Sequence, residues 1–500
     1  MRLPTFSLPG GRPAASNGVA GRGRSAHLAA LAAAVLTACG SLPDRGAAER
    51  ATAALPTAWN APLPHGGSSA ELVRWWADFD DPLVARLVTA ADAASPTVAS
   101  ARARIEEARA ARIAAGALLL PAVDAQASFS RGRPDLSVPT GNSAGVSLGA
   151  GWELDVFGGN RARRAAAGER LGAAEASWHD ARVAVAAETA TTYAQLRNCE
   201  GRLAQARLDA RSRGETARLT DLSTGAGFES RANAALARAS AAQARTLVAQ
   251  QAQACSELLK ALTALTAIAE PALRAELASA TARMPLPRAI AVTAVPASAL
   301  AQRPDVFAAG REVEAASADV RQADAARLPR VSLAGSIGRS RFETSAGTLS
   351  GNVWSVGPVA VSVPVFDAGA RRADAAAARA RYEAAVAAYA GTLREAVREV
   401  ENALVALQTA IDRQADAEIA AVDFEAAVRA VDARYRSGLG SLFELEDARR
   451  NALTAQNLLL DLSRDRTAAW IALYRALGGG WQAPADTPPL LTGAPVTRTP

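Results

Sequence analysis

Apolar positions along the chain follow two different periods, and each period marks a different kind of element. Two long tracts contain no proline, one between Pro139 and Pro271 and one between Pro364 and Pro484. In the second tract, apolar residues recur every three or four positions, at Val386, Tyr389, Leu393, Val397, Val400, Leu404, Leu407 and Ile411. This heptad-like spacing predicts long helices that pack side by side. A helix over residues 371–437 would extend about 100 Å at about 1.5 Å per residue.

Four shorter segments alternate between apolar and polar or small residues, which predicts β-strands. They are residues 122–129, 145–156, 331–342 and 353–365, joined in pairs by polar or glycine-rich loops. Lengths of about 10 residues match tilted outer-membrane strands, but four strands cannot close a barrel, since the smallest have about eight. Open sheet edges are prohibitive in lipid. The pattern therefore predicts a transmembrane β-barrel shared by several copies of the chain, and three copies would supply twelve strands.

The two halves of the chain repeat the same order of elements with a period near 210 residues. Residues 120–123 recur as 328–331, and residues 156–161 recur as 365–371. The glycine-rich segment 224–227 aligns with 437–440. Each half contains a helix, a proline, a strand pair, a glycine-rich turn and a long helical hairpin. The chain is therefore expected to be a mixed α and β membrane protein of two structural repeats, 71–285 and 286–482, with a long α-helical coiled-coil barrel.

Composition supports close helix packing and argues against a compact globular core. Half of the residues are hydrophobic, but only 5% are aromatic, and alanine is abundant. Alanine has the best helix propensity and lets helix backbones approach closely. The formal charge of +6 comes mostly from Arg2, Arg12, Arg22 and Arg24, and the remaining charges are interspersed. This distribution argues against nucleic acid as a partner.

The N-terminal segment has the pattern of an export signal. An apolar run at residues 26–38 follows two arginines and is too short to span a bilayer of about 30 Å. It ends in Leu-Thr-Ala-Cys at 36–39, which resembles the bacterial lipobox. The resemblance implies a lipoprotein signal peptide at 1–38, a lipid on the sulfur of Cys39 and a lipidated linker at 39–70. An ordinary secretory signal is the alternative. Gly40 follows the cysteine, where aspartate would retain the protein at the inner membrane, so the outer membrane is favoured.

Four motifs stand in order along about residues 70–482. They are Trp75-Trp76 with Phe79-Asp80-Asp81-Pro82-Leu83, Trp152-Glu153-Leu154-Asp155-Val156-Phe157-Gly158, Arg303-Pro304-Asp305-Val306 and Leu477-Gly478-Gly479-Gly480-Trp481. They resemble the TolC family of outer-membrane efflux ducts, in the lipoprotein branch that serves resistance-nodulation-division pumps. The resemblance implies a homotrimer with a twelve-stranded barrel in the outer membrane and a twelve-helix tunnel in the periplasm. It also implies passive conduction, with an inner-membrane resistance-nodulation-division pump and a periplasmic adaptor protein as partners.

The resemblance further implies a periplasmic gate at the tips of the helical hairpins. Glu444 and Asp447 match two acidic residues that line the closed aperture in the family. Their spacing places both on one helix face, and three copies would form two acidic rings that attract cations. A solvated acidic turn is the alternative, because the neighbouring residues are also charged. In the first half, Arg231 stands at the position that corresponds to Glu444, and a pair between Arg231 and either acidic residue would lock the closed state.

The hairpin turns are the expected docking tip for the adaptor. Five residues are assigned to it: Gly225, Gly227, Gly438, Leu439 and Ser441. An ordinary role in ending the helices is compatible with this assignment, since glycine readily adopts the left-handed conformation.

Two cysteines remain after Cys39. Cys199 and Cys255 lie 28 residues on either side of Gly227, so an antiparallel hairpin places them at similar height. A disulfide is open to them in the oxidising periplasm. Cys199 also falls among Tyr193, Leu196 and Leu203 on a packed face. This second reading, two packed free thiols, is the favoured one.

Catalysis has little support in the sequence, and no enzyme activity, metal or cofactor is expected. His27 lies in the signal, His65 in the linker, and His179 on a helix as a surface or seam residue. Two other functions stay open: the outer-membrane duct of a type I secretion system, and a periplasmic coiled-coil adaptor that does not conduct. The lipobox argues against the first, and the apolar strand pairs argue against the second. Residues 483–500 are expected to form a disordered tail.

Overall fold

A computed structural model of the chain describes residues 46–61, 75–77, 79–133, 139–287, 289–290 and 299–483. The predicted signal peptide, Cys39 and the C-terminal tail from residue 484 lie outside the described residues. All elements below therefore belong to the part of the chain from Asp44 onward.

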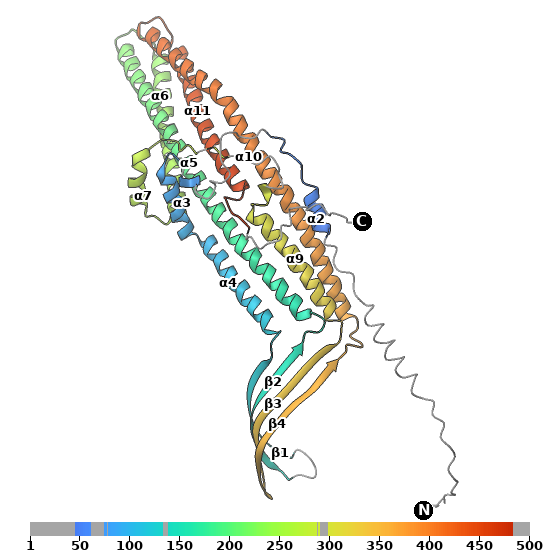
Figure 1. The fold of residues 1–500 in the computed structure, drawn as a ribbon. Helices are drawn as coiled ribbons and strands as arrows, with labels where there is room; N and C mark the ends of the chain where they lie inside the picture. The colour runs from blue at the N-terminus through green and yellow to red at the C-terminus, as the bar shows by residue number, and fades with distance from the viewer. Residues whose placement is uncertain are drawn as a thin grey trace, which may run out of the picture. The chain divides into compact units, whose positions relative to one another are not determined.

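Two long helical hairpins dominate the fold (Figure 1). The first joins α5 (Gly159–Gly225) to α6 (Arg231–Thr266), and the second joins α10 (Ala370–Arg436) to α11 (Leu442–Ala476). Helices α5 and α10 have 67 residues each, and α5 also packs against α11. The long hairpins predicted from the proline-free tracts are confirmed. Among the described helices, none combines the length and hydropathy needed to cross a membrane.

Shorter helices pack against the long hairpins. Helix α4 (Pro96–Ala117) packs beside α5, and α9 (Pro304–Ala325) packs against both α5 and α10. Helix α3 (Pro82–Ala94) packs on α5 and α6, and α2 (Gly46–Ala53) packs on α10. Helix α7 (Glu270–Leu277) continues into the short 3₁₀ turn Ala278–Ala280. Local sequence sets their starts, because α3 and α4 each combine a capping side chain, Asp81 or Ser95, with proline in the first turn.

The strands form one antiparallel sheet in the order β1-β2-β3-β4. They are β1 (Ala122–Gly132), β2 (Gly141–Leu154), β3 (Arg330–Thr344) and β4 (Gly347–Ser362), and they extend from the ends of the helices (Figure 1). Both predicted strand pairs are confirmed, with different ends. Strand β2 begins four residues earlier than expected, because its first residues pair with Phe342, Glu343 and Thr344 of β3. Strands β1 and β4 are the edges, and each pairs with one neighbour.

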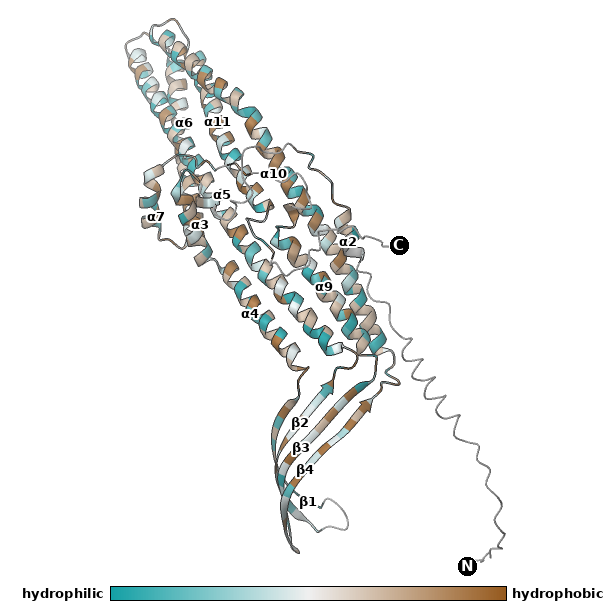
Figure 2. Ribbon diagram, in the orientation of Figure 1, coloured by the Kyte–Doolittle hydropathy of each residue, from teal (hydrophilic) through white to brown (hydrophobic). Residues whose placement is uncertain are grey.

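The strand register gives the sheet two chemically different faces. One, here called the apolar face, consists mainly of large apolar side chains: Val123, Phe129, Val146, Leu148, Trp152, Leu333, Ile337, Trp354, Val356, Val359 and Val361. The other face carries mostly serine, glycine and alanine, with Asp124, Gln126 and Glu153. Brown and pale residues alternate along β3 and β4 in Figure 2. Most of the apolar face is solvent-exposed in the single chain, so it needs an apolar environment.

The heptad-like positions of the second hairpin form much of the core. Tyr389, Leu393, Val400, Leu404 and Leu407 are buried, and Val386 and Val397 pack at the margin of the core. Ile411 is the exception, since it is exposed in the single chain. The helix continues beyond it toward the tip, where small residues such as Ala417 and Ala421 are buried instead.

The motif around Trp75 and Trp76 fixes the segment before α3 onto the end of α11. The rings of Trp75 and Tyr474 stack with centroids 4.8 Å apart, and Trp76 meets Tyr474 edge to face at 4.7 Å. Phe79 lies against both tryptophans. Asp81 accepts hydrogen bonds from the Leu83 backbone N–H at 3.0 Å and from the Tyr193 hydroxyl. Burial and the Asp81 carboxylate raise the pKa of Tyr193, so its hydroxyl stays a donor.

Arg303, the first residue of the third motif, is a buried cation at the junction of three segments. Its guanidinium donates to both carboxylate oxygens of Asp305 at 2.9 and 2.6 Å. It also donates to Glu399 Oε2 on α10 at 2.7 Å and to the Ala476 carbonyl at the end of α11 at 2.8 Å. The motif thus ties the start of α9 to both helices of the second hairpin.

The glycines after α11 are needed because the chain turns close to the same segment. Gly478 has a φ of +82°, and a Cβ there would lie 2.9 Å from the Arg303 Cα and overlap the Gln302 carbonyl. We expect Gly478→Ala to destabilise the protein by about 2 kcal/mol, through strain and steric overlap. Gly214→Ala is the matched control, since Gly214 lies within α5 with no atom near its missing Cβ, and it should stabilise by about 0.5–1 kcal/mol. Thermal unfolding followed by circular dichroism would measure both, and equal midpoints would contradict this explanation of the glycine.

Cys199 and Cys255 form a disulfide between α5 and α6, with Cα atoms 5.5 Å apart. The favoured prediction of two free thiols was wrong, although Cys199 does lie on the packed face with Tyr193 and Leu196. The reason is the antiparallel hairpin, which brings two packed positions of the same height into direct contact.

Candidate functional site: the tips of the helical hairpins

The two hairpins end in turns of the same construction. Helix α5 closes with the Gly227 N–H bonded to the Thr224 carbonyl at 3.1 Å and the Phe228 N–H bonded to the Ser223 carbonyl at 2.9 Å. Helix α10 closes in the same way, from Gly438 to Tyr435 at 3.0 Å and from Leu439 to Arg434 at 2.9 Å. This is the Schellman motif, with glycine in the left-handed position. Both glycines have positive φ, +85° and +75°.

The following helices also start alike. Ser230 accepts from the Asn233 N–H at 3.0 Å and begins α6, and Ser441 accepts from the Glu444 N–H at 3.1 Å and begins α11. Ser441, one of the predicted tip residues, is therefore a helix cap. Gly227, Gly438 and Leu439 lie in the turns as predicted, whereas Gly225 is the last residue of α5.

This geometry corrects the alignment of the two tips by two residues. Gly227 corresponds to Gly438, and Ser230 corresponds to Ser441, so the counterpart of Glu444 is Asn233 and not Arg231. The expected equivalence of Arg231 and Glu444 was wrong, because Gly225 resembles a turn glycine in the sequence but belongs to the helix. Arg231 is the first residue of α6 and is exposed.

Glu444 and Asp447 lie on the first two turns of α11 and remain accessible. Glu444 is 3.8 Å from Arg434 at the end of α10. Asp447 contacts Arg450 and accepts from the Asn451 side chain at 3.2 Å. Within the single chain, both carboxylates are thus associated with basic or amide groups other than Arg231.

A set of buried and partly buried charges, here called the tip network, lies beside these exposed acids. It consists of Asp209 and Arg213 on α5, Asp432 on α10, and Glu446 and Arg449 on α11. Arg213 pairs with Asp209 at 2.8 Å and with Glu446, and Arg449 pairs with Glu446 at 3.1 Å and with Asp432 at 3.4 Å. The Arg449 side chain is only 6% exposed and that of Glu446 only 15%. Charges alternate in sign along this chain of contacts.

Hydroxyl groups extend the tip network to all four long helices. Ser240 on α6 donates to Glu446 Oε2 at 2.5 Å and accepts from Arg213 at 2.7 Å. Thr216 on α5 accepts from Arg449 at 3.0 Å. Nearer the turn, the hydroxyls of Thr220 on α5 and Tyr435 on α10 are 3.0 Å apart. The first hairpin is therefore held to the second by buried polar contacts close to the tip.

Sequence reasoning missed this network. The alternative of a solvated acidic turn rested on the charges of Glu446, Arg449 and Arg450, and of these three only Arg450 is exposed. Asp209 and Arg213 show a local signal, an acidic and a basic residue four apart, but that spacing is equally common on exposed helix faces. Nothing local identifies a partner 233 residues away along the chain.

Apolar side chains are exposed at the same tips. Phe228 and Leu439, which follow the turn glycines, are 86% and 75% exposed, and Phe443 on α11 is 72% exposed. The tips thus combine exposed apolar residues on the outside with a buried charge network just behind them.

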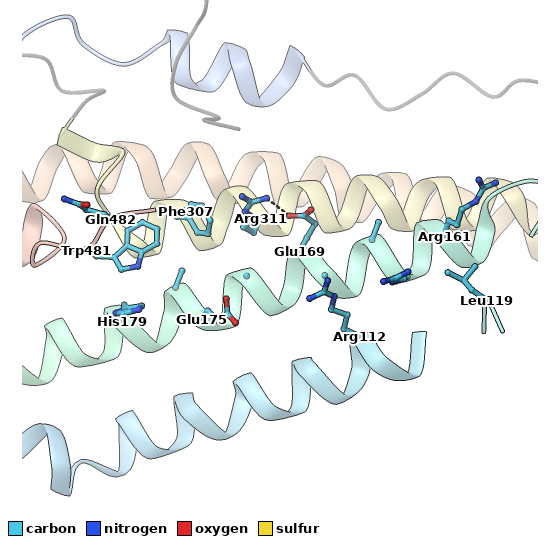
Figure 3. Close-up of a pocket in the computed structure, with 15 residues that line it drawn as sticks. Arg112, Leu119, Arg161, Glu169, Glu175, His179, Phe307, Arg311, Trp481 and Gln482 are labelled. Atoms are coloured by element: carbon cyan, nitrogen blue, oxygen red, sulfur yellow. Dashed lines mark hydrogen bonds and ion pairs between the residues drawn. The ribbon is translucent and has the colours of Figure 1, made fainter. Parts of the chain in front are cut away.

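A separate groove lies on the sheet-proximal half of the helices (Figure 3). It has a volume of about 710 Å³ and lies between α4, α5, α9 and the segment at Trp481. Arg311 pairs with Glu169 at 2.8 Å and lies over the Phe307 ring, which in turn contacts Trp481. His179 lies at one end, and partial burial together with Arg182 lowers the pKa of its imidazole. These contacts tie α5 to α9 and the C-terminal segment. His179, expected as a surface or seam residue, lies with its ring centroid 6.3 Å from that of Trp481.

Two long antiparallel hairpins with matching tips, joined to a four-stranded sheet with one apolar face, define a channel protein of the TolC-like type. The family model described as "Outer membrane efflux protein" matches residues 87–269 and 295–479, and the chain belongs to this family. Its relatives include the outer membrane protein OprJ of Pseudomonas aeruginosa, 32% identical over 465 residues that cover 91% of this chain and 95% of the relative. Another is the toluene efflux pump outer membrane protein TtgI of Pseudomonas putida, 30% identical, covering 89% and 96%.

Solved structures agree with this membership. A membrane protein from Pseudomonas aeruginosa superimposes with a TM-score of 0.74 at 30% identity, covering 85% of this chain and 98% of that one. The outer membrane protein VceC of Vibrio cholerae gives 0.72 at 26% identity, covering 82% and 99%. The protein is therefore an outer-membrane channel component of an efflux pump.

Proposed function

We propose that three copies of this chain form one channel, in which β4 of each copy pairs with β1 of the next. The observation that carries this proposal is the open sheet: β1 and β4 each pair with one neighbour in the chain, and the apolar face is exposed. Unpaired backbone groups at a sheet edge are costly in lipid. Because β1 and β4 run in opposite directions, adjacent copies meet as antiparallel strands, and three copies close a twelve-stranded barrel.

Cysteine cross-linking tests this arrangement in the membrane. One cysteine replaces Ser128 in β1 and another replaces Ser355 in β4, with neighbouring edge positions sampled because the register between copies is set by the assembly. We expect disulfide-linked dimers and trimers for some combinations, and none when the β1 cysteine is moved to Ser143 in β2. A protein that stays monomeric in mild detergent and shows no cross-linked species would rule the shared barrel out.

In this assembly the helices of the three copies form a twelve-helix periplasmic tunnel. The tips of the hairpins bind a periplasmic adaptor, which links the channel to an inner-membrane pump of the resistance-nodulation-division class. The exposed Phe228, Leu439 and Phe443 support a protein contact at the tips, together with the predicted tip residues Gly225, Gly227, Gly438 and Ser441. Cys39 carries the lipid anchor in this proposal. The channel conducts passively, and relatives named for toluene and for pyoverdine export indicate small solutes as cargo.

We assign the gate to the same tips. In this proposal Glu444 and Asp447 of three copies line the closed aperture as two acidic rings, and a pair between Arg231 and either acidic residue locks the closed state. The tip network holds α10 and α11 against α5 and α6 and so stabilises the closed arrangement. Buried charge pairs suit such a role, because breaking one is costly while the pair itself adds little to overall stability.

A further inference from the structure

We propose that the outer end of the apolar face binds a phosphorylated glycolipid of the outer leaflet, through Arg339 and Arg341 on β3 and Arg131 on β1. The inference rests on the proposed function, which directs the apolar face toward lipid. It adds a ligand and a site to a surface that a channel needs only as an apolar wall.

The register places all three arginines on the apolar face. Arg339 lies between Val146 and Asn352, and Arg341 lies between Ala144 and Ser350. Both follow Ile337 at intervals of two residues, so their side chains leave the strand on the side of Ile337 and Trp354. Arg131 follows Phe129 in the same way and pairs with Asn142.

These arginines lie near the boundary between the apolar interior of the membrane and its headgroup region. Arg341 is ten residues along β3 from Val331, which lies at the helical end of the apolar face. At about 3.3 Å per residue this is about 33 Å of strand, and a tilt of about 40° reduces it to about 25 Å of height, the usual apolar band of an outer-membrane protein. Exposed Trp354 lies in register with Ile337, two residues before Arg339, and exposed Phe129 lies in register with Arg341, so aromatic residues flank the arginines as they do at a membrane boundary. By the same arithmetic Arg339, eight residues from Val331, lies at about 20 Å, so the charged side chains begin in the outermost part of the apolar band.

The chemistry of the three side chains fits phosphate. Arginine binds phosphate oxygens through two parallel N–H donors, which a single lysine ammonium cannot do. Arg341 is also 3.3 Å from Glu343 on the same face, while Arg131 and Arg339 make no ion pair with other described residues. All three are exposed in the single chain. The local charge of the face at this level is positive.

An amphiphile can contact both the apolar side chains and the arginines of this surface, whereas a free anion can contact only the arginines. Acyl chains would lie along Val146, Ile337 and Trp354, and a phosphate at the boundary between chain and headgroup would then meet Arg339 and Arg341. A free phosphate would make only exposed charge pairs, which contribute little in water. The surface therefore favours a lipid whose phosphate is covalently joined to a bulky acylated headgroup.

Binding can be measured on the purified full-length trimer with lipopolysaccharide as the probe. Native mass spectrometry and the shift of the thermal midpoint on lipid addition report occupancy for the wild type and for the double variant Arg339→Gln/Arg341→Gln. The control is Arg330→Gln, which changes an arginine of the same strand on the opposite face. Single variants at Arg131 and Arg339 serve if the double variant assembles poorly.

We expect the double variant to bind lipopolysaccharide about tenfold more weakly, and the control to bind as the wild type does. Dephosphorylated lipopolysaccharide should bind the wild type about tenfold more weakly than intact lipopolysaccharide does. Millimolar inorganic phosphate should not displace the bound lipid. Equal binding by wild type and double variant, or full displacement by inorganic phosphate, would overturn the proposal. Assembly is read separately from the oligomer mass, so failure of the trimer is distinguishable from failure of the lipid site.

Discussion

Replacing Arg303 with methionine should remove most of the folded protein. The substitution keeps the length and apolar stem of the side chain but leaves Asp305 and Glu399 without their shared cation, and it leaves the Ala476 carbonyl without a donor. Breaking a buried ion pair by removing one partner costs about 3–5 kcal/mol, and because the side chains of Asp305 and Glu399 are 30% and 28% exposed, we expect the lower end of this range. We therefore expect a large fall in the thermal midpoint and a low yield of assembled channel.

Arg398→Met is the matched control for this experiment. Arg398 lies on α10 next to Glu399, but it pairs with Glu395 on the exposed surface. An exposed pair of this kind contributes about 0–1 kcal/mol, so the control should unfold close to the wild-type midpoint. The measurement is heat-induced loss of helical circular dichroism in detergent. If both variants unfold at the same temperature, the junction at Arg303 does not support the second hairpin as described.

Glu446→Gln should open the channel without unfolding it. The amide keeps the shape of the side chain but removes the negative charge shared by Arg213 on α5 and Arg449 on α11, which keep only Asp209 and Asp432 as acidic partners. If this costs the closed arrangement about 3 kcal/mol, the ratio of closed to open channels falls by about two orders of magnitude. The disulfide between Cys199 and Cys255 lies further from the tip and should keep the first hairpin intact.

Single-channel recording in planar bilayers measures the expected rise in open probability. Glu215→Gln is the matched control, because Glu215 forms an exposed pair with Arg218 on α5 in the same region of the hairpin. The open probability of Glu215→Gln should equal that of the wild type. An unchanged open probability for Glu446→Gln, with the oligomer intact, would show that the tip network is structural and does not hold the gate.

The elements of this fold could be predicted from the sequence because each depends on a local period. Residues repeating at three and four positions mark the long helices, alternation marks β1 to β4, and a glycine-rich segment marks the region of each hairpin turn. The four motifs that resemble the TolC family lie where a packed junction needs them, as Arg303 and Gly478 illustrate. The periods depend only on neighbours along the chain, whereas the contacts that Arg303 and Gly478 make at this junction come from tertiary packing.

The contacts between distant segments were decided by the tertiary structure alone. The partners of Glu446, the pairing of Cys199 with Cys255 and the two-residue offset between the hairpin tips depend on how separate helices pack, and single-helix spacing does not encode this. A charged residue four positions from an opposite charge looks the same whether its helix face is solvated or buried. The sequence therefore determined that there are long hairpins and an open sheet with an apolar face. Packing between the helices determined which charges are buried, because burial requires the surface of a second segment.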